Sequence, residues 1–164
     1  EAGIENRIIT GTASKVAHSW NIVKIDDKWY HTDVTFDMGI SQKNIVRRDY
    51  FNMTDEQIDR DHFFENKYPI CAETKDNYFI KNKLNLASLS EVTNLIDRAI
   101  RNKTNCIYFL FAGKPFESSR LPDLIAERLK IFIGESRPIV AVKFSNTSNL
   151  PQRIYFLRWK ISDN

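Results

Sequence analysis

The run from His18 to Asp37 constrains the fold of this chain more than any other segment. Its two halves, Ser19 to Ile25 and Lys28 to Phe36, are rich in β-branched and aromatic residues, which favour extended strands. The Asp26-Asp27 pair between them indicates a tight turn, because aspartate tolerates positive φ and its carboxylate can bond to nearby backbone groups. The run is therefore predicted to form a β-hairpin.

A two-residue turn also fixes the register of this hairpin. The first pair that it predicts is Ile25 with Lys28. The pairs farther from the turn are Ile22 with His31, Trp20 with Asp33, and His18 with Thr35. Because opposite residues share a face and side chains alternate along a strand, all of these side chains are expected on one face. His18 and Asp33 become diagonal neighbours with Cβ atoms about 7–8 Å apart or a little less, so their side chains can meet. A four-residue loop preserves this arrangement, whereas a three-residue loop would place the two side chains on opposite faces.

A histidine beside an aspartate has a defined chemistry. The imidazole can take a proton from a nucleophile and later return it to a leaving group. The carboxylate accepts a hydrogen bond from the other ring nitrogen, which fixes the tautomer and stabilises the imidazolium. His18 and Asp33 thus fit the base and orienting members of a catalytic triad. The same spacing is equally compatible with a surface hairpin in which the two residues are neighbours by chance.

Residues 4–37 also resemble a known family, through the motifs His18-Ser-Trp-Asn and Trp29-Tyr-His-Thr-Asp33-Val-Thr. These motifs are similar to the second half of bacterial transglutaminase-like domains, and the segment from Tyr50 to Pro69 is similar to the next segment of those domains. The resemblance implies a papain-like fold, in which a helix with the nucleophilic cysteine packs on an antiparallel sheet. It also implies that His18 is the catalytic base and acid and that Asp33 orients it.

The family's cysteine lies before the strand that corresponds to residues 7–10, and no cysteine stands there in this sequence. The chain begins Glu1-Ala-Gly-Ile without an initiator methionine, and these residues are expected to be the tail of the cysteine helix, with Gly3 ending it. We therefore expect a fragment cut just after the cysteine helix, with a natural pseudoenzyme as the alternative. Cys71 comes after a Tyr-Pro-Ile sequence in a polar segment, and Cys106 lies in an apolar, strand-like run. Neither position offers a helix N-terminus or a nearby cation to lower the thiol pKa, so Cys106 is expected to be a buried core residue and Cys71 to be structural or merely exposed.

These residues support two functional hypotheses. The first is a fragment of a cysteine acyltransferase or peptidase that acts on peptide or protein substrates, uses no metal or cofactor, and is inactive without its cysteine. Trp20 and His31 share the face of the pair and are candidates for substrate contact, although Trp20 is more typical of core packing. His62, beside Phe63, is either a further ligand or acid or simply the end of a helix. The alternative function is a non-catalytic module that binds peptide or cell-wall material.

Composition argues against several classes of protein. A formal charge of +3, with Lys and Arg alternating with Asp and Glu, gives no basic stripe for nucleic-acid binding. No apolar run approaches the ~20 residues that span a bilayer. A sheet without the cysteine helix would expose an apolar face, so self-association or burial by a second domain is expected. The resemblance points to a bacterial protein and leaves its location open, with the cell surface or the extracellular space as candidates.

The sequence pattern changes near residue 82, which predicts one domain at 1–82 and another at 83–164. In the first, Thr54 to Gln57 has the form of a capping box and is expected to open a helix that ends near Asp61. In the second, helical stripes near 88–100 and 121–132 alternate with strand-like runs at 106–112, 139–144 and 153–161. We therefore predict an α+β protein: an antiparallel papain-like sheet, then a small α/β accessory domain with two helices on one face of a three-stranded sheet.

Overall fold

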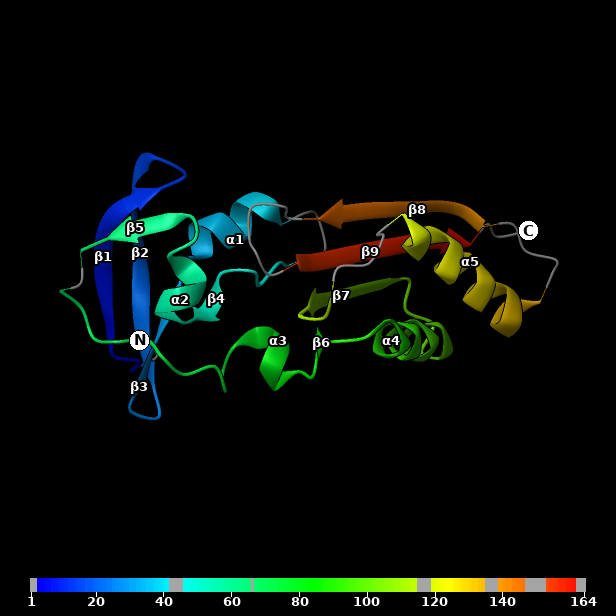
Figure 1. Ribbon diagram of the computed structural model, residues 1–164, viewed down its shortest axis with the longest axis horizontal. Helices are drawn as coiled ribbons and strands as arrows, with labels where there is room; N and C mark the ends of the chain where they lie inside the picture. Colours follow the sequence, from blue (N-terminus) through cyan, green and yellow to red (C-terminus); the bar gives the residue numbers. More distant parts are fainter. Residues whose placement is uncertain are drawn as a thin grey trace. The chain divides into compact units, whose positions relative to one another are not determined.

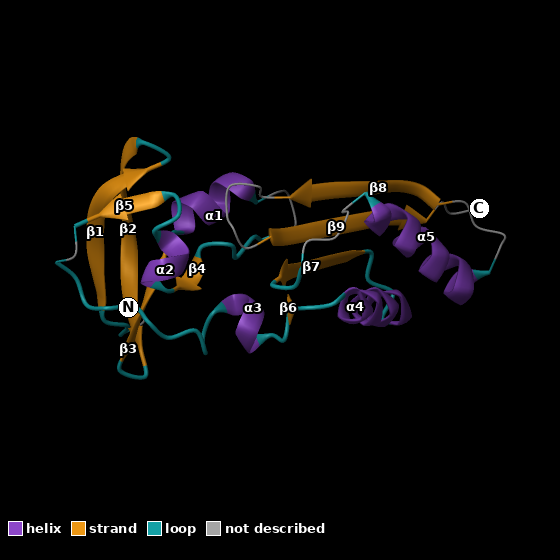
Figure 2. Ribbon diagram, viewed as in Figure 1, coloured by secondary structure: helices purple, strands orange, loops and turns teal. Residues whose placement is uncertain are grey.

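The computed structural model describes residues 3–41, 46–65, 67–114, 119–134, 139–146 and 153–161, which fold into two compact units (Figure 1). Among these residues the first unit ends at Lys83 and the second begins at Leu84. Each unit combines helices with a sheet of its own (Figure 2), so the predicted mixed α+β class is confirmed. Residues 1 and 2, the expected end of a helix, lie outside the described residues.

Five antiparallel strands form the described sheet of the first unit, in the order β4-β3-β2-β1-β5. They are β1 (Asn6–Ala13), β2 (Val16–Ile25), β3 (Lys28–Thr32), β4 (Phe51–Met53) and β5 (His62–Phe64). The short helices of this unit are α1 (Val34–Ile40), α2 (Asp55–Ile58) and α3 (Tyr78–Lys81). One face of the sheet packs Ile9, Trp20 and Ile22 against Cys71.

The opposite face of this sheet leaves two large apolar side chains in solvent. Ile8 on β1 is 66% exposed and Phe63 on β5 is 56% exposed. Phe63 lies opposite Thr12, which shares the strand parity of Ile8, so both side chains belong to the same face. The self-association expected from the sequence stays a prediction.

The hairpin of β2 and β3 has the predicted turn and register. Asp26 and Asp27 both adopt positive φ, 47° and 60°, as a two-residue turn of the I′ type requires. Ile25 pairs with Lys28, and Ile22 pairs with His31, as the sequence predicts.

The second strand of the hairpin ends earlier than predicted. β3 stops at Thr32, and Val34 begins helix α1, so the expected pairs of Trp20 with Asp33 and of His18 with Thr35 are wrong. The cause is helix capping: the Asp33 carboxylate accepts the backbone N–H of Phe36 at 3.0 Å, which satisfies a donor that a helix start leaves free. Thr35 consequently lies exposed on the helix.

Helix α2 begins with the predicted capping box but is shorter than predicted. The Thr54 hydroxyl accepts the N–H of Gln57, and the Gln57 side chain accepts the N–H of Thr54. The helix ends at Ile58, and three residues of turn lead into β5. His62 therefore begins a strand, opposite Ala13 of β1, rather than ending a helix.

The second unit packs two helices against one face of its sheet. The described strands have the order β6-β7-β9-β8, with β6 parallel to β7 and the other pairs antiparallel. The elements are β6 (Asn85–Leu86), α4 (Leu89–Arg101), β7 (Cys106–Phe111), α5 (Arg120–Ile133), β8 (Ile139–Asn146) and β9 (Arg153–Ile161). Alternate residues of β7, namely Ile107, Phe109 and Phe111, contribute to one core with apolar residues of both helices. The sheet thus has the two-residue strand β6 beyond the three strands that were predicted.

No helix in the described part of the chain is both long enough and apolar enough to cross a membrane.

Candidate functional site

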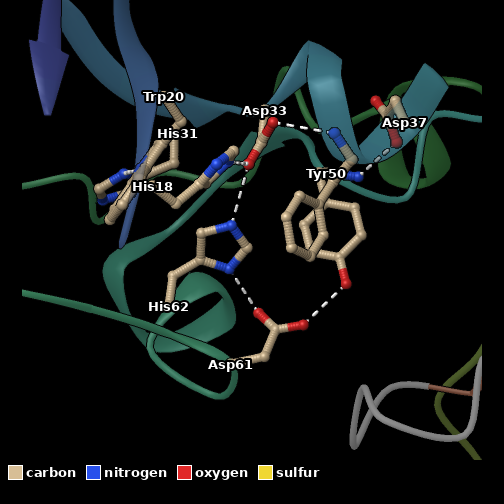
Figure 3. A network of polar contacts seen from close by, with 9 residues as sticks. His18, Trp20, His31, Asp33, Asp37, Tyr50, Asp61 and His62 are labelled. Atoms are coloured by element: carbon tan, nitrogen blue, oxygen red, sulfur yellow. Dashed lines mark hydrogen bonds and ion pairs between the residues drawn. The ribbon is translucent and has the colours of Figure 1, made fainter. Parts of the chain in front are cut away.

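The candidate site joins His18 of β2 to Asp33 at the start of α1. His18 Nε2 lies 2.5 Å from Asp33 Oδ2 (Figure 3). The Asp33 side chain is 1% exposed and the His18 side chain 16% exposed, so the carboxylate is buried while an edge of the ring reaches solvent. The predicted partners therefore meet, although the backbone brings Asp33 there as a helix cap and not as a strand residue.

Asp33 accepts hydrogen bonds on both carboxylate oxygens. Oδ1 accepts the Phe36 N–H, and Oδ2 faces both His18 Nε2 and His62 Nε2, the latter at 3.0 Å. Burial by itself would raise the pKa of Asp33. Hydrogen bonds from His62, from the Phe36 N–H and from His18 outweigh that effect, so the pKa of Asp33 is lowered. The group that faces His18 is therefore an ionised carboxylate whose orientation is fixed by three donors.

His18 keeps one ring nitrogen for other chemistry. Asp33 occupies Nε2, and Nδ1 has no hydrogen-bond partner within the described residues. The ring packs against Trp20, with centroids 6.0 Å apart and planes inclined by 15°, and against Phe36, at 5.0 Å between centroids. These aromatic neighbours restrict rotation of the imidazole and hold Nδ1 in one direction.

His62 completes the site and was not among the predicted catalytic residues. Its ring is fully buried, with Nε2 facing Asp33 and Nδ1 lying 2.6 Å from Asp61 Oδ1. Burial opposes a charge on the ring, but the hydrogen bonds to Asp33 and Asp61 are stronger and raise the pKa of His62. The sequence left open whether His62 is a further ligand or acid or the end of a helix, because β5 pairs with β1 across about fifty residues of chain and not with a neighbour in sequence.

Tyr50 connects Asp61, the second carboxylate that contacts His62, to the rest of the site. Its hydroxyl donates to Asp61 Oδ2 at 2.7 Å, while its carbonyl accepts the N–H of Asp33 at 3.0 Å. Its own N–H donates to Asp37 Oδ1 at 2.9 Å. Burial of Asp37, moderated by that N–H and reinforced by the charge of Asp49, raises the pKa of Asp37 to about 7. Tyr50 thus contacts Asp33, Asp37 and Asp61, all three of which are labelled in Figure 3.

A second polar cluster lies on the same sheet and contains the two predicted substrate contacts. Trp20 Nε1 donates to His31 Nδ1 at 3.0 Å, and His31 Nε2 lies 2.7 Å from Asp55 Oδ1. Because an indole can only donate, His31 Nδ1 carries no proton, and the ring is neutral with its hydrogen on Nε2. Burial, which outweighs the attraction of Asp55, lowers the pKa of His31. Trp20 and His31 are both buried, and His31 contacts Asp55 rather than Asp33, so their contact with substrate stays a prediction.

Cys71 ends this second cluster and is not an activated thiol. Its N–H donates to Asp55 Oδ2 at 3.1 Å, and its side chain is buried. Burial and the Asp55 carboxylate raise the pKa of the thiol to about 12, so at neutral pH it holds its proton. Cys106 is partly buried on β7, in the second unit.

Two groups of three potential metal ligands occur among the described residues. They are His18, Asp33 and His62, and His31, Asp55 and Cys71, with ligand atoms within 4.8 Å of one another. In the second group the Trp20 N–H occupies His31 Nδ1, so His31 Nε2 carries the proton and has no lone pair for a metal. In the first group both nitrogens of His62 face carboxylates. Hydrogen bonding therefore accounts for both groups.

A comparison of the chain with models of protein families gives no match, and neither does a comparison with curated proteins. The function is accordingly inferred from the geometry and chemistry of the site.

Proposed function

We propose that this chain carries the base and the orienting residue of a transglutaminase-like cysteine acyl-transfer site on a papain-like sheet. The observation that carries the proposal is the 2.5 Å contact between His18 Nε2 and the buried Asp33 Oδ2. The motifs around both residues support it, since they resemble the same part of transglutaminase-like domains. On this proposal residues 1–82 are the second half of the catalytic domain, and residues 83–164 form an accessory domain.

The proposed mechanism uses the two nitrogens of His18 for different tasks. Asp33 holds Nε2–H, so Nδ1 takes the thiol proton as the sulfur attacks the acyl carbon. The C–S bond forms, the tetrahedral intermediate expels an amine, and that amine leaves with the proton from Nδ1. An amine or water then attacks the thioester and gives its proton to Nδ1. The C–S bond breaks, and the sulfur takes the proton back from Nδ1, which restores the thiol. Throughout, the Asp33 carboxylate stabilises the imidazolium that forms in each half of the reaction.

The nucleophile of this mechanism is proposed to come from a cysteine outside the present chain. Cys71 is buried, has a pKa of about 12, and lies beside His31 and Asp55 instead of His18. Cys106 lies within strand β7 and not at a helix N-terminus that would activate its thiol. The chain by itself is therefore expected to show no thiol-dependent turnover.

The test uses protein extended by the residues that its gene encodes before residue 1. Incorporation of a primary amine into a glutamine peptide and hydrolysis of peptides distinguish transglutaminase from peptidase. His18→Ala and Asp33→Asn are expected to lower kcat/KM by about 10⁴-fold, the scale seen when a triad loses its orienting carboxylate. Cys71→Ser is the matched control and should keep full activity. Turnover by the present chain alone, or an active His18→Ala enzyme, would contradict the proposal. Ser, Ala or Gly in place of the upstream cysteine would favour a non-catalytic peptide- or wall-binding module.

A further inference from the structure

We infer that His62 is a fixed imidazolium that positions Asp33 for His18, and this role rests on the proposed function of the pair. Each nitrogen of the His62 ring faces a carboxylate oxygen. His62 Nε2 lies 3.0 Å from Asp33 Oδ2, and Nδ1 lies 2.6 Å from Asp61 Oδ1. Ionised carboxylates can only accept hydrogen bonds, so each nitrogen must carry a proton to bond with its partner. A neutral ring would direct a lone pair at a carboxylate oxygen in a buried site.

His31 provides the opposite case in the same sheet. It also has a carboxylate beside Nε2, namely Asp55, but its Nδ1 accepts the Trp20 N–H. That ring needs one proton and is neutral, whereas the ring of His62 needs two and is charged. The difference between the two histidines comes from the partner on Nδ1, and both rings are almost fully enclosed by protein.

The charge on His62 has a direct consequence for the candidate active site. The groups that face it are the carboxylates of Asp33 and Asp61 and the rings of His18, Tyr50 and His31. Two carboxylates and one imidazolium leave the cluster with one negative charge while His18 is neutral. When His18 takes a proton during acyl transfer, the carboxylate charge that His62 leaves uncompensated balances it, and the cluster becomes neutral.

The same contacts fix the orientation of the carboxylate that His18 uses. His62 holds Oδ2 of Asp33 and the Phe36 N–H holds Oδ1, so the plane of the carboxylate is set from both sides. Asp61 holds the far side of the His62 ring, and the Tyr50 hydroxyl holds Asp61. The positioning chain therefore runs from Tyr50 through Asp61, His62 and Asp33 to His18.

Nitrogen NMR of the histidine rings tests the charge on the chain as it exists. The sequence has three histidines, so single His→Gln variants assign every ring signal. At pH 7.5 the His62 ring should show two protonated nitrogens and the His31 ring one. Asp61→Asn removes one carboxylate charge and should lower the pH at which His62 loses its proton by about one to three units. The matched control Asp55→Asn should leave His31 neutral.

A neutral His62 at pH 7.5 overturns the inference, and the wild-type spectrum decides this even if Asp61→Asn does not fold. The positioning role is tested in the extended enzyme through the pH profile of kcat/KM. Asp61→Asn should move the alkaline limb to lower pH, because His62 then loses its charge sooner, and an unmoved limb would refute the role. If His62 is charged but the His18→Ala enzyme remains active, the proposed function is refuted, while the charge on His62 stands.

Discussion

Replacing Asp33 separates its task as a helix cap from its task as a buried anion. Asp33→Ser keeps a side-chain oxygen that can accept the Phe36 N–H but removes the charge, whereas Asp33→Ala removes both. The carboxylate is 1% exposed and bonds to two histidines, one of them fully buried. Removing one partner of such a buried pair costs about 3–5 kcal/mol, because the other charge is left without compensation. Loss of the cap adds about 1 kcal/mol in Asp33→Ala.

These costs are a large part of the 5–15 kcal/mol that stabilises a typical domain, so both variants should be close to unfolding at moderate urea. Urea titrations followed through the NMR signals of the indole N–H groups report each unit separately. Trp20 lies in the first unit and Trp159 in the second, which matters because a chain with two units need not unfold in one step. The shift in the midpoint of the Trp20 signal, multiplied by the slope m, gives the change in the free energy of unfolding.

The pH dependence of the same experiment checks the electrostatic origin of the effect. The pKa of Asp33 is lowered in the folded state, so its contribution is present above the unfolded value of 3.8 and is lost as pH falls through the folded pKa. The difference between wild type and Asp33→Ser should therefore be full at pH 7 and shrink in strong acid. A loss below about 0.5 kcal/mol at pH 7, the range of ordinary surface substitutions, would refute the reasoning.

Three further predictions concern positions away from the pair. Gly11→Ala would place its Cβ 2.2 Å from the Phe63 carbonyl and should lower the free energy of unfolding by about 1–3 kcal/mol, whereas Gly39→Ala meets open space on a helix and should raise it by about 1 kcal/mol, both measured by urea unfolding. The pKa of Asp37 is raised to about 7, so ionisation destabilises the fold as pH rises from about 4 to 7; Asp37→Asn should gain stability over wild type between pH 5 and pH 8, and an unchanged difference would contradict this. Ser88→Ala removes the capping box of α4 and should cost about 1 kcal/mol in the unfolding of the second unit, seen at Trp159.

Features that depend on neighbouring residues could be predicted from the sequence, whereas features that depend on contacts between distant segments could not. Asp26-Asp27 indicated the turn because aspartate tolerates positive φ, and the register of the inner pairs resulted from that turn. The end of β3 was misplaced because Asp33 is both a plausible strand residue and a strong N-cap, and tertiary context chose the cap. The contact of His18 with Asp33 nevertheless forms, since the cap position lies directly after the predicted strand.

His62 and β6 were beyond local patterns for two different reasons. The role of His62 depends on the pairing of β5 with β1 and on the position of Asp61 after a helix that ended earlier than predicted, and neither is set by nearby residues. Strand β6 has two residues, too few for an alternating pattern, and exists because it pairs in parallel with β7. The papain-like core remains part of the proposal.

The most direct test of the central claim, that His18 takes the thiol proton, is the reaction of the proposed upstream cysteine with iodoacetamide. The rate of this reaction is measured against pH in the extended protein. If His18, held by Asp33, takes the thiol proton, the wild-type thiolate should persist well below pH 8.5, the ordinary pKa of a thiol being about 8.5. His18→Ala should return the reaction to the profile of a free thiol, and Asp33→Ser should lie between the two. A wild-type profile that already matches a free thiol, or one that His18→Ala leaves unchanged, would contradict the account.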